Sequence, residues 1–125
     1  AYYSGMEFQI MDDVLGLTAN EKILGKPVGS DLREGKRTLI IIHALKHADE
    51  QQRKIILSAL GNKKISAEET RKVVSMLNQL GSIEYAASDA KRYLEMSNSQ
   101  LNKFPDSLVK KLFLDLNDFI IRREY

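Results

Sequence analysis

The sequence has no cysteine, which excludes both a disulfide framework and a metal site built on thiolates. The same absence is typical of a cytoplasmic protein. Long apolar runs are missing too: the longest, residues 39–42, is far shorter than the ~20 residues that span a bilayer. Charge of one sign is in little excess, and a net charge of +2 gives no support for nucleic-acid binding. What remains is a chain of 125 residues, long enough for one domain with a hydrophobic core.

The charges are distributed unevenly along the chain. Residues 1–18 contain three acidic residues and no basic one. Residues 19–37 contain five basic residues and three acidic ones. An acidic segment is therefore followed at once by a basic one, an order that suits a bound cation beside a bound anion.

The apolar pattern is helical almost throughout and contains no convincing strand, so we expect an all-α fold of about six helices. The first helix covers residues 2–18, and the loop that follows, 19–35, is rich in glycine and contains Pro27. After this loop, apolar residues recur at helical spacing in segments separated by polar residues or glycine, which predicts further helices. These helices cover residues 36–48, 49–60 and 67–80, a segment that starts at 82 and ends at Pro105, and a last helix.

Local signals mark where these helices begin. Asp49 is a predicted N-cap, and Ser66 with Glu69 forms a predicted capping box. Asp106 is the predicted cap of the last helix. That helix carries an apolar stripe of four residues at helical spacing: Leu108, Leu112, Leu116 and Phe119.

Two adjacent carboxylates, Asp12 and Asp13, lie on the otherwise apolar first helix. Asp12 continues a small or polar edge that also holds Gly5, Gln9 and Gly16. Two neighbouring carboxylates are costly to bury unless a positive charge meets them. Magnesium is the natural candidate, because it takes oxygen ligands and keeps water and phosphate partners.

The loop after this helix suits phosphate. Lys26 and Lys36 flank a turn rich in glycine, whose backbone N–H groups and lysine charges both favour a phosphate group. From spacing alone, an equally good interpretation is a solvated acidic patch followed by a charged surface turn.

The order of residues is more specific than their spacing. The pattern GxxFQxxDD over residues 5–13 is followed by LGKPxGSDLREGKxTL over residues 24–39. This arrangement resembles the second aspartate-rich region of trans-prenyltransferases, the polyprenyl diphosphate synthases that make farnesyl, geranylgeranyl or longer-chain diphosphates. The resemblance covers about a third of the chain, residues 5–45. The remaining helices match the family in length and order only.

The resemblance implies that residues 1–125 are the C-terminal part of a single synthase domain, the C-terminal helices of the isoprenoid synthase helical bundle. Such enzymes condense an allylic diphosphate with isopentenyl diphosphate. Magnesium held by two aspartate-rich motifs draws off the allylic diphosphate, and the double bond of isopentenyl diphosphate attacks the carbocation. The family commonly forms dimers, so we expect a homodimer. The chain begins inside an expected helix, and we expect it to be truncated.

The resemblance also assigns roles to individual residues. Asp12 is implied as a direct magnesium ligand, and Asp13 as a ligand through water or a supporting partner. Lys26 and Lys36 are implied to hold the allylic diphosphate. Asp31 is implied to steer Lys26 or a metal-bound water.

The resemblance implies two further roles, and the sequence departs from the family pattern at two positions. Phe8 is implied to line the isoprenoid cavity, and Gln9 to orient a water or the diphosphate. The family motif reads Asp-Asp-x-x-Asp, whereas Gly16 stands at its third position here. Ile40 stands where the family often has proline, which affects only the entry to a helix.

The first aspartate-rich motif is absent from this sequence. Asp115 and Asp118 form the nearest pattern, and they are interpreted as the polar face of the last helix. We therefore expect this chain to be inactive alone, with the rest of the synthase chain as its partner. The alternative is a non-catalytic subunit or diphosphate-binding module. A terpene cyclase is a weaker third interpretation, because the loop from Lys26 to Lys36 resembles chain-elongating synthases.

Histidines offer a further candidate metal site. His43 and His47 lie one helical turn apart, a spacing that can bind metal. No third ligand is near in sequence, so we expect His43 to be a core histidine with a polar partner. Arg122 and Arg123 are expected to stabilise the end of the last helix.

Overall fold

The computed structural model describes residues 2–18 and 28–122, where the regular structure is α-helical throughout. This confirms the all-α prediction. The helices in these ranges are α1 (Tyr2–Thr18), α3 (Ser30–Arg33), α4 (Leu39–His47), α5 (Glu50–Ala59), α6 (Ala67–Gln79), α7 (Ser82–Leu101) and α8 (Leu108–Arg122). The short α3 lies inside the segment predicted as loop, and this accounts for the additional helix. None of the described helices combines the length and the apolar character needed to cross a membrane.

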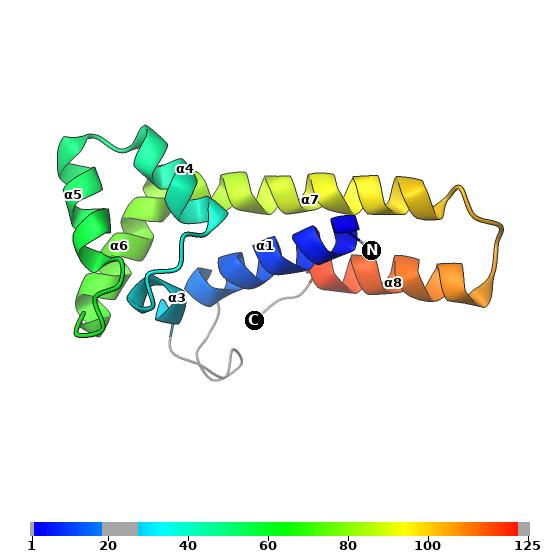
Figure 1. Cartoon of the computed structure of the whole chain (residues 1–125), viewed down its shortest axis with the longest axis horizontal. Helices are drawn as coiled ribbons and strands as arrows, with labels where there is room; N and C mark the ends of the chain where they lie inside the picture. Colours follow the sequence, from blue (N-terminus) through cyan, green and yellow to red (C-terminus); the bar gives the residue numbers. More distant parts are fainter. Residues whose placement is uncertain (1, 19–27, 123–125) are drawn as a thin grey trace.

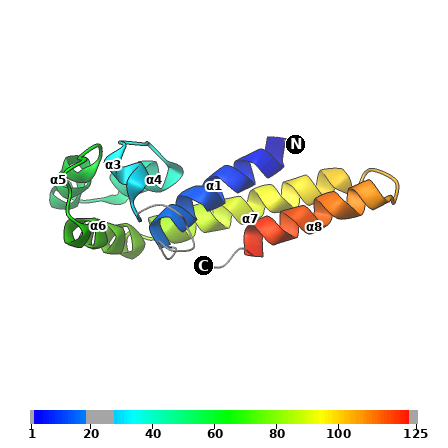
Figure 2. The same cartoon turned by 90° about the horizontal axis from the view of Figure 1, so that it is seen from below.

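Helix α7 is the longest described helix, and the other helices are arranged along it (Figures 1 and 2). Helix α1 runs along it in the opposite direction, and α8 folds back beside the far half of α7. Helices α4, α5 and α6 gather at the other end of α7, and α3 lies beside the C-terminal end of α1. The last two turns of α1 are thereby placed beside α3 and the start of α4.

The hydrophobic core lies where α1, α4, α6 and the first half of α7 meet. Ala86 and Ala90 of α7 are fully buried, and such small side chains allow neighbouring helices to approach closely. Large aliphatic side chains from the other helices fill the remaining volume; among them are Ile10, Val14, Ile40, Ile56 and Leu77. This burial fixes α1 by one face and leaves its opposite edge to carry polar residues.

Both predicted N-caps, Asp49 of α5 and Ser66 of α6, are present, but the reciprocal side-chain bond of a capping box forms at α5 and not between Glu69 and Ser66 in the described part of the chain. The Asp49 carboxylate accepts a hydrogen bond from the backbone N–H of Gln52 at 2.8 Å. The side-chain oxygen of Gln52 in turn accepts one from the backbone N–H of Asp49. The Ser66 hydroxyl accepts the backbone N–H of Glu69 at 3.1 Å. These bonds satisfy backbone donors that the first helical turn leaves without partners.

The predicted cap of α8 is wrong. Helix α8 begins at Leu108, so Ser107 precedes it directly, and its hydroxyl accepts the backbone N–H of Lys110 at 3.1 Å. Asp106 lies one residue too early and instead forms an ion pair with the Lys110 side chain. Both residues are good caps, and only the first helical residue decides between them.

Helix α8 exposes its predicted apolar stripe. The four residues Leu108, Leu112, Leu116 and Phe119 are between 49% and 72% exposed. The face of α8 that is buried holds Asn117 and Ile120. The Asn117 amide donates to Ser97 Oγ at 2.9 Å and to Asn98 Oδ1 at 3.1 Å, so polar bonds tie α8 to α7.

Candidate functional site

The polar side chains of α1 divide between its two sides. Asp13 is buried, whereas Asp12 is only partly covered and Gln9 is exposed. Because residues four apart stack on a helix, Gln9 lies over Asp13, and its side-chain amide donates to Asp13 Oδ1 at 3.2 Å. The motif is therefore one buried carboxylate with its own amide partner, next to a second carboxylate that solvent reaches.

Lys36 meets Asp13 from the segment that enters α4. Its Nζ donates to Asp13 Oδ1 at 3.0 Å and lies 3.9 Å from Asp31 Oδ2. The backbone N–H of Lys36 also donates to the carbonyl of Asp31 at 3.0 Å. One lysine thus bridges a carboxylate of α1 and a carboxylate of α3 that lie 18 residues apart in the sequence.

Helix α3 is positioned by a glycine. Gly29 has a φ of 81°, and its N–H donates to the carbonyl of Gly16 at 3.0 Å, which ties the start of α3 to α1. A Cβ at Gly29 would lie 2.6 Å from Thr70 Cγ2 on α6. Only glycine combines this backbone conformation with so close an approach. Leu32 then anchors α3 with 2% of its surface exposed.

Gly16, the departure at the third motif position, lies beside Asp31. A Cβ at Gly16 would be 3.7 Å from Asp31 Oδ2, an ordinary contact distance. The space next to the missing third carboxylate is therefore bordered by a carboxylate from α3. Asp31 stands closest to this position among the side chains that a Cβ there would meet.

The electrostatics favour the charged lysine. Burial is the largest influence on Asp13 and raises its pKa, while the bonds from Lys36 and Gln9 oppose this shift. The hydrogen bond to Asp13 is the largest influence on Lys36 and raises its pKa, with Asp31 and Asp12 adding to the effect. Lys36 therefore stays protonated, and three carboxylates share its charge.

Asp12 is the carboxylate available to a ligand. It forms no hydrogen bond or ion pair with the described part of the chain. Phe8, at 47% exposed, and Gln9 lie on the same accessible side of α1. A partly solvated carboxylate of this kind suits magnesium, which is usually held by one or two carboxylates together with water and phosphate.

The hollow between α1 and α3 is too small for a diphosphate. It is bordered by Asp13, Asp31, Lys36 and their apolar neighbours and has a volume of about 10 Å³, the size of one water at most. Within residues 2–18 and 28–122, no three acidic, histidine or cysteine side chains converge as a metal site. A metal and its phosphate partners would therefore approach Asp12 from the exposed edge of α1. Lys26 lies outside the described residues.

The predictions missed one buried acid, Glu7. Its side chain is fully buried, and neither carboxylate oxygen has a hydrogen-bond partner within the described ranges. Burial raises the pKa of Glu7 to about 7. The helical period contained the signal, because Glu7 shares a face with Ile10, Met11 and Val14.

His43 has the polar partner that was expected. Its Nδ1 lies 2.8 Å from Ser82 Oγ, and its ring stacks on Tyr85 with a centroid distance of 4.3 Å. The ring centroid of His47 also lies 4.3 Å from that of His43. Burial is the main reason that the pKa of His43 is lowered. This arrangement ties α4 to α7.

Known proteins resemble the chain over nearly its whole length. The family model for polyprenyl synthetase matches residues 1–77. The short chain isoprenyl diphosphate synthase of Methanocaldococcus jannaschii is 47% identical over 121 residues, which cover 97% of this chain and 36% of that protein. The chain therefore spans little more than a third of the length of the curated relatives that it matches.

Solved structures agree in fold. The geranylgeranyl pyrophosphate synthetase of Pyrococcus horikoshii has a TM-score of 0.89 and 41% identity, over 98% of this chain and 37% of that one. The geranylgeranyl pyrophosphate synthase of Corynebacterium glutamicum, in complex with isoprenyl diphosphate and magnesium, has a TM-score of 0.90 and 27% identity, over 98% and 35% of the two chains. These structures confirm the helical-bundle fold that the resemblance implied.

Proposed function

Because the chain belongs to the polyprenyl synthetase family, we propose that it supplies the second magnesium and diphosphate half-site of a prenyl diphosphate synthase. The whole enzyme would condense an allylic diphosphate with isopentenyl diphosphate. The observation that carries this proposal is the partly accessible Asp12 next to the ion pair between buried Asp13 and Lys36, whose side chain is 42% exposed. It combines one oxygen ligand on α1 with the positive charge of Lys36, which is close enough to interact with Asp12 electrostatically.

Each side chain has a definite task in this proposal. Asp12 holds magnesium from the exposed edge, where water and phosphate oxygens can complete its shell. When bound, magnesium supplies charge neutralisation for the departing diphosphate. Asp13, itself held by the Gln9 amide, holds the amine of Lys36 in place, and Lys36 with Lys26 provides positive charge for the phosphate oxygens.

The remaining roles and the assembly of the enzyme are also part of this proposal. Phe8 contributes an apolar surface for the isoprenoid chain, and Asp31 steers Lys26 or a metal-bound water; in the structure Asp31 lies 3.9 Å from Lys36 Nζ. Residues 1–125 are proposed to be the C-terminal part of one synthase domain, whose remainder carries the opposing aspartate-rich motif. The whole synthase is proposed to be a cytoplasmic homodimer. Without the opposing motif the chain is expected to be inactive, because ionisation needs the diphosphate stabilised from both sides.

Isothermal titration calorimetry tests the half-site directly. Inorganic diphosphate is titrated into the chain with magnesium, and the titration is repeated with Asp12→Asn. We expect at least tenfold weaker binding for the variant, because it loses an ionic oxygen ligand. Asp118→Asn is the matched control, since Asp118 is paired with Arg122 on α8. Equal binding by the chain and by Asp12→Asn would remove Asp12 from the site.

A non-catalytic subunit is the second candidate, and Gly16 favours it because one motif carboxylate is absent. The chain can be mixed with the part of the Methanocaldococcus jannaschii synthase that it does not match. Product formed from an allylic diphosphate and isopentenyl diphosphate supports the enzyme. A stable complex that binds diphosphate and makes no product supports the subunit.

A further inference from the structure

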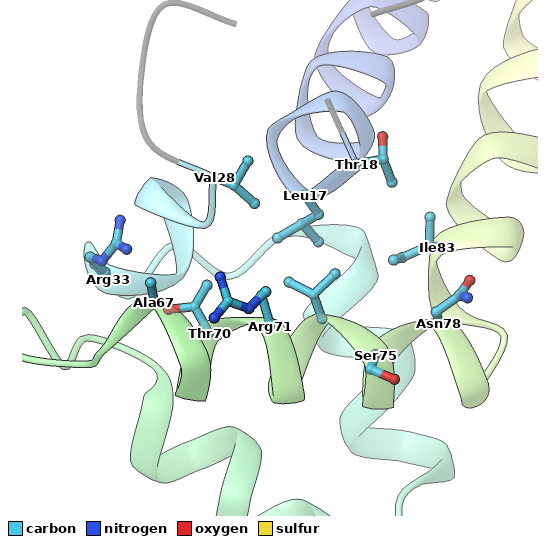
Figure 3. Close-up of a pocket in the computed structure, with 11 residues that line it drawn as sticks. Leu17, Thr18, Val28, Arg33, Ala67, Thr70, Arg71, Ser75, Asn78 and Ile83 are labelled. Carbon is cyan, nitrogen blue, oxygen red and sulfur yellow. The ribbon is translucent and has the colours of Figure 1, made fainter. Parts of the chain in front are cut away.

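A second cavity lies beside the C-terminal end of α1 and is distinct from the small hollow at Asp13 and Lys36. Its volume is about 550 Å³, and α6 forms its floor (Figure 3). The C-terminal end of α1, the entry to α3 and the first turn of α7 complete its walls. Cavities of this size hold small organic ligands in many proteins.

The walls of this cavity are mainly aliphatic. Leu17 and Val28 contribute from one side and Ile83 from another (Figure 3), and Val74 of α6 also lines the cavity. These residues offer apolar surface for several carbon atoms of a ligand, alongside the polar lining residues Thr70, Ser75 and Asn78. Leu17 also borders the small hollow of Asp13 and Lys36, so it separates the two sites.

Two arginines give the cavity a charged end. Arg33 is the last residue of α3, and Arg71 lies in the second turn of α6; Figure 3 shows both towards the same end, away from Asn78 and Ile83. They are the charged members of the lining. Neither guanidinium forms an ion pair with residues 2–18 or 28–122, whereas the neighbouring Lys72 pairs with Glu68 at 3.7 Å.

We propose that this cavity binds an anionic amphiphile, a molecule with an apolar chain and a phosphate or carboxylate head. The chain packs on Leu17, Val74 and Ile83, and the head lies between Arg33 and Arg71. Arginine suits this role because its planar group forms paired hydrogen bonds with both phosphate and carboxylate. No metal is needed, which distinguishes this site from the proposed magnesium site at Asp12.

Two sources share this chemistry. One is a prenyl diphosphate, which rests on the proposed function of the chain; the other is an alkyl acid. The test uses the whole chain in EDTA, so that binding at Asp12 is suppressed. Geranyl diphosphate, decanoate, geraniol and inorganic diphosphate are titrated separately, and amide shifts are followed by NMR.

Geranyl diphosphate is expected to shift the amides of Thr70, Arg71, Ser75 and Asn78. Geraniol and inorganic diphosphate, which lack the head or the chain, are expected to bind at least tenfold more weakly. Binding of decanoate at the same amides identifies a general site for anionic amphiphiles, and its failure to bind restricts the site to prenyl diphosphates.

Variants separate this site from its surroundings. The double variant Arg33→Gln, Arg71→Gln is expected to weaken binding of geranyl diphosphate at least tenfold, and Val74→Phe to do so by filling the cavity. Lys72→Gln is the matched control on α6 and should bind normally. Asp12→Asn should also bind normally in EDTA, although it fails in the magnesium-dependent titration.

Circular dichroism checks that each variant is folded. Unchanged binding by the folded arginine double variant would overturn the proposal. Shifts that map to the exposed edge of α1 instead of α6 would overturn it equally. Loss of magnesium-dependent binding in Asp12→Asn tests the proposed function alone.

Discussion

At the scale of single residues, Asp13 and Lys36 form the ionic centre of the candidate site. The carboxylate is buried and has two donors, one of which is the lysine amine. Removing the amine would leave a buried carboxylate with only the Gln9 amide. Leaving a buried polar group short of a partner costs about 1–3 kcal/mol.

We therefore expect Lys36→Met to lower the free energy of unfolding in urea by about that amount. The methionine keeps the length of the side chain and removes only the charge. In the double variant Asp13→Asn, Lys36→Met, much of the stability should return. If Lys36→Met alone is as stable as the parent chain, the ion pair does not hold α1 to α3 and α4.

Glu7 makes stability depend on pH. Burial raises its pKa from 4.5 to about 7, so the folded chain binds a proton more tightly than the unfolded chain. Burial of Glu7 therefore does not destabilise the folded chain below about pH 4.5. The destabilisation grows as the pH rises towards 7 and then levels off.

Urea unfolding at several pH values between 4.5 and 8 measures this effect. The stability of Glu7→Gln minus that of the parent chain should rise across this window. Glu84→Gln, at an exposed position on α7, is the control and should show no such rise. Parallel pH curves for Glu7→Gln and the parent chain would contradict the assignment.

At the scale of elements, local sequence patterns predicted most of the helices, but they did not predict where some helices begin, and they did not predict the short helix α3. Asp49 and Ser66 cap their helices as expected, because the chain offers no competing cap beside them. Asp106 and Ser107 do compete, and the position of the first helical residue decides between them.

Two features depend on tertiary structure and could not be predicted from local pattern. The turn α3 exists because Gly29 contacts both α1 and α6. The order Asp12, Asp13 and Lys36 was predictable by resemblance, whereas the direct bond between Asp13 and Lys36 was not. Spacing along the chain gives residue types, but it does not give which of two adjacent carboxylates is buried.

Gly29 is the element-scale position most sensitive to substitution. Gly29→Ala would place a side chain in the left-handed region, which costs roughly 1–2 kcal/mol, and would also meet Thr70 Cγ2. Thermal unfolding should show the loss. Adding Thr70→Ser removes the methyl group and should restore part of it.

Gly5→Ala is the matched comparison for Gly29→Ala. Gly5 lies on α1, and nothing surrounds the position of an added Cβ within 4 Å. Alanine is favoured over glycine inside a helix by about 1 kcal/mol, so this variant should gain stability. Equal effects at both glycines would show that α3 is not packed on α6 as described.

At the scale of the whole molecule, the most exposed apolar surface belongs to α8. Four large apolar side chains of its stripe are exposed, more than isolated surface residues would explain. We expect the chain to self-associate through this stripe as its concentration rises. Sedimentation velocity should show the association and should show less of it for the double variant Leu112→Lys, Leu116→Lys.

Glu84→Lys is the control for added charge, because it adds the same charge as the double variant at an exposed position near the start of α7, away from α8. It should associate like the parent chain. Association that persists in the double variant would mean that another face is responsible.

The central claim is that a divalent cation and diphosphate meet at Asp12. Manganese is a paramagnetic substitute for magnesium and broadens NMR signals close to where it binds. With inorganic diphosphate present, we expect manganese to broaden the amide signals from Gln9 to Asp13 and of Lys36, and we expect this broadening to be lost in Asp12→Asn. Broadening that is centred on another part of the chain, or that is unchanged in Asp12→Asn, would contradict the claim.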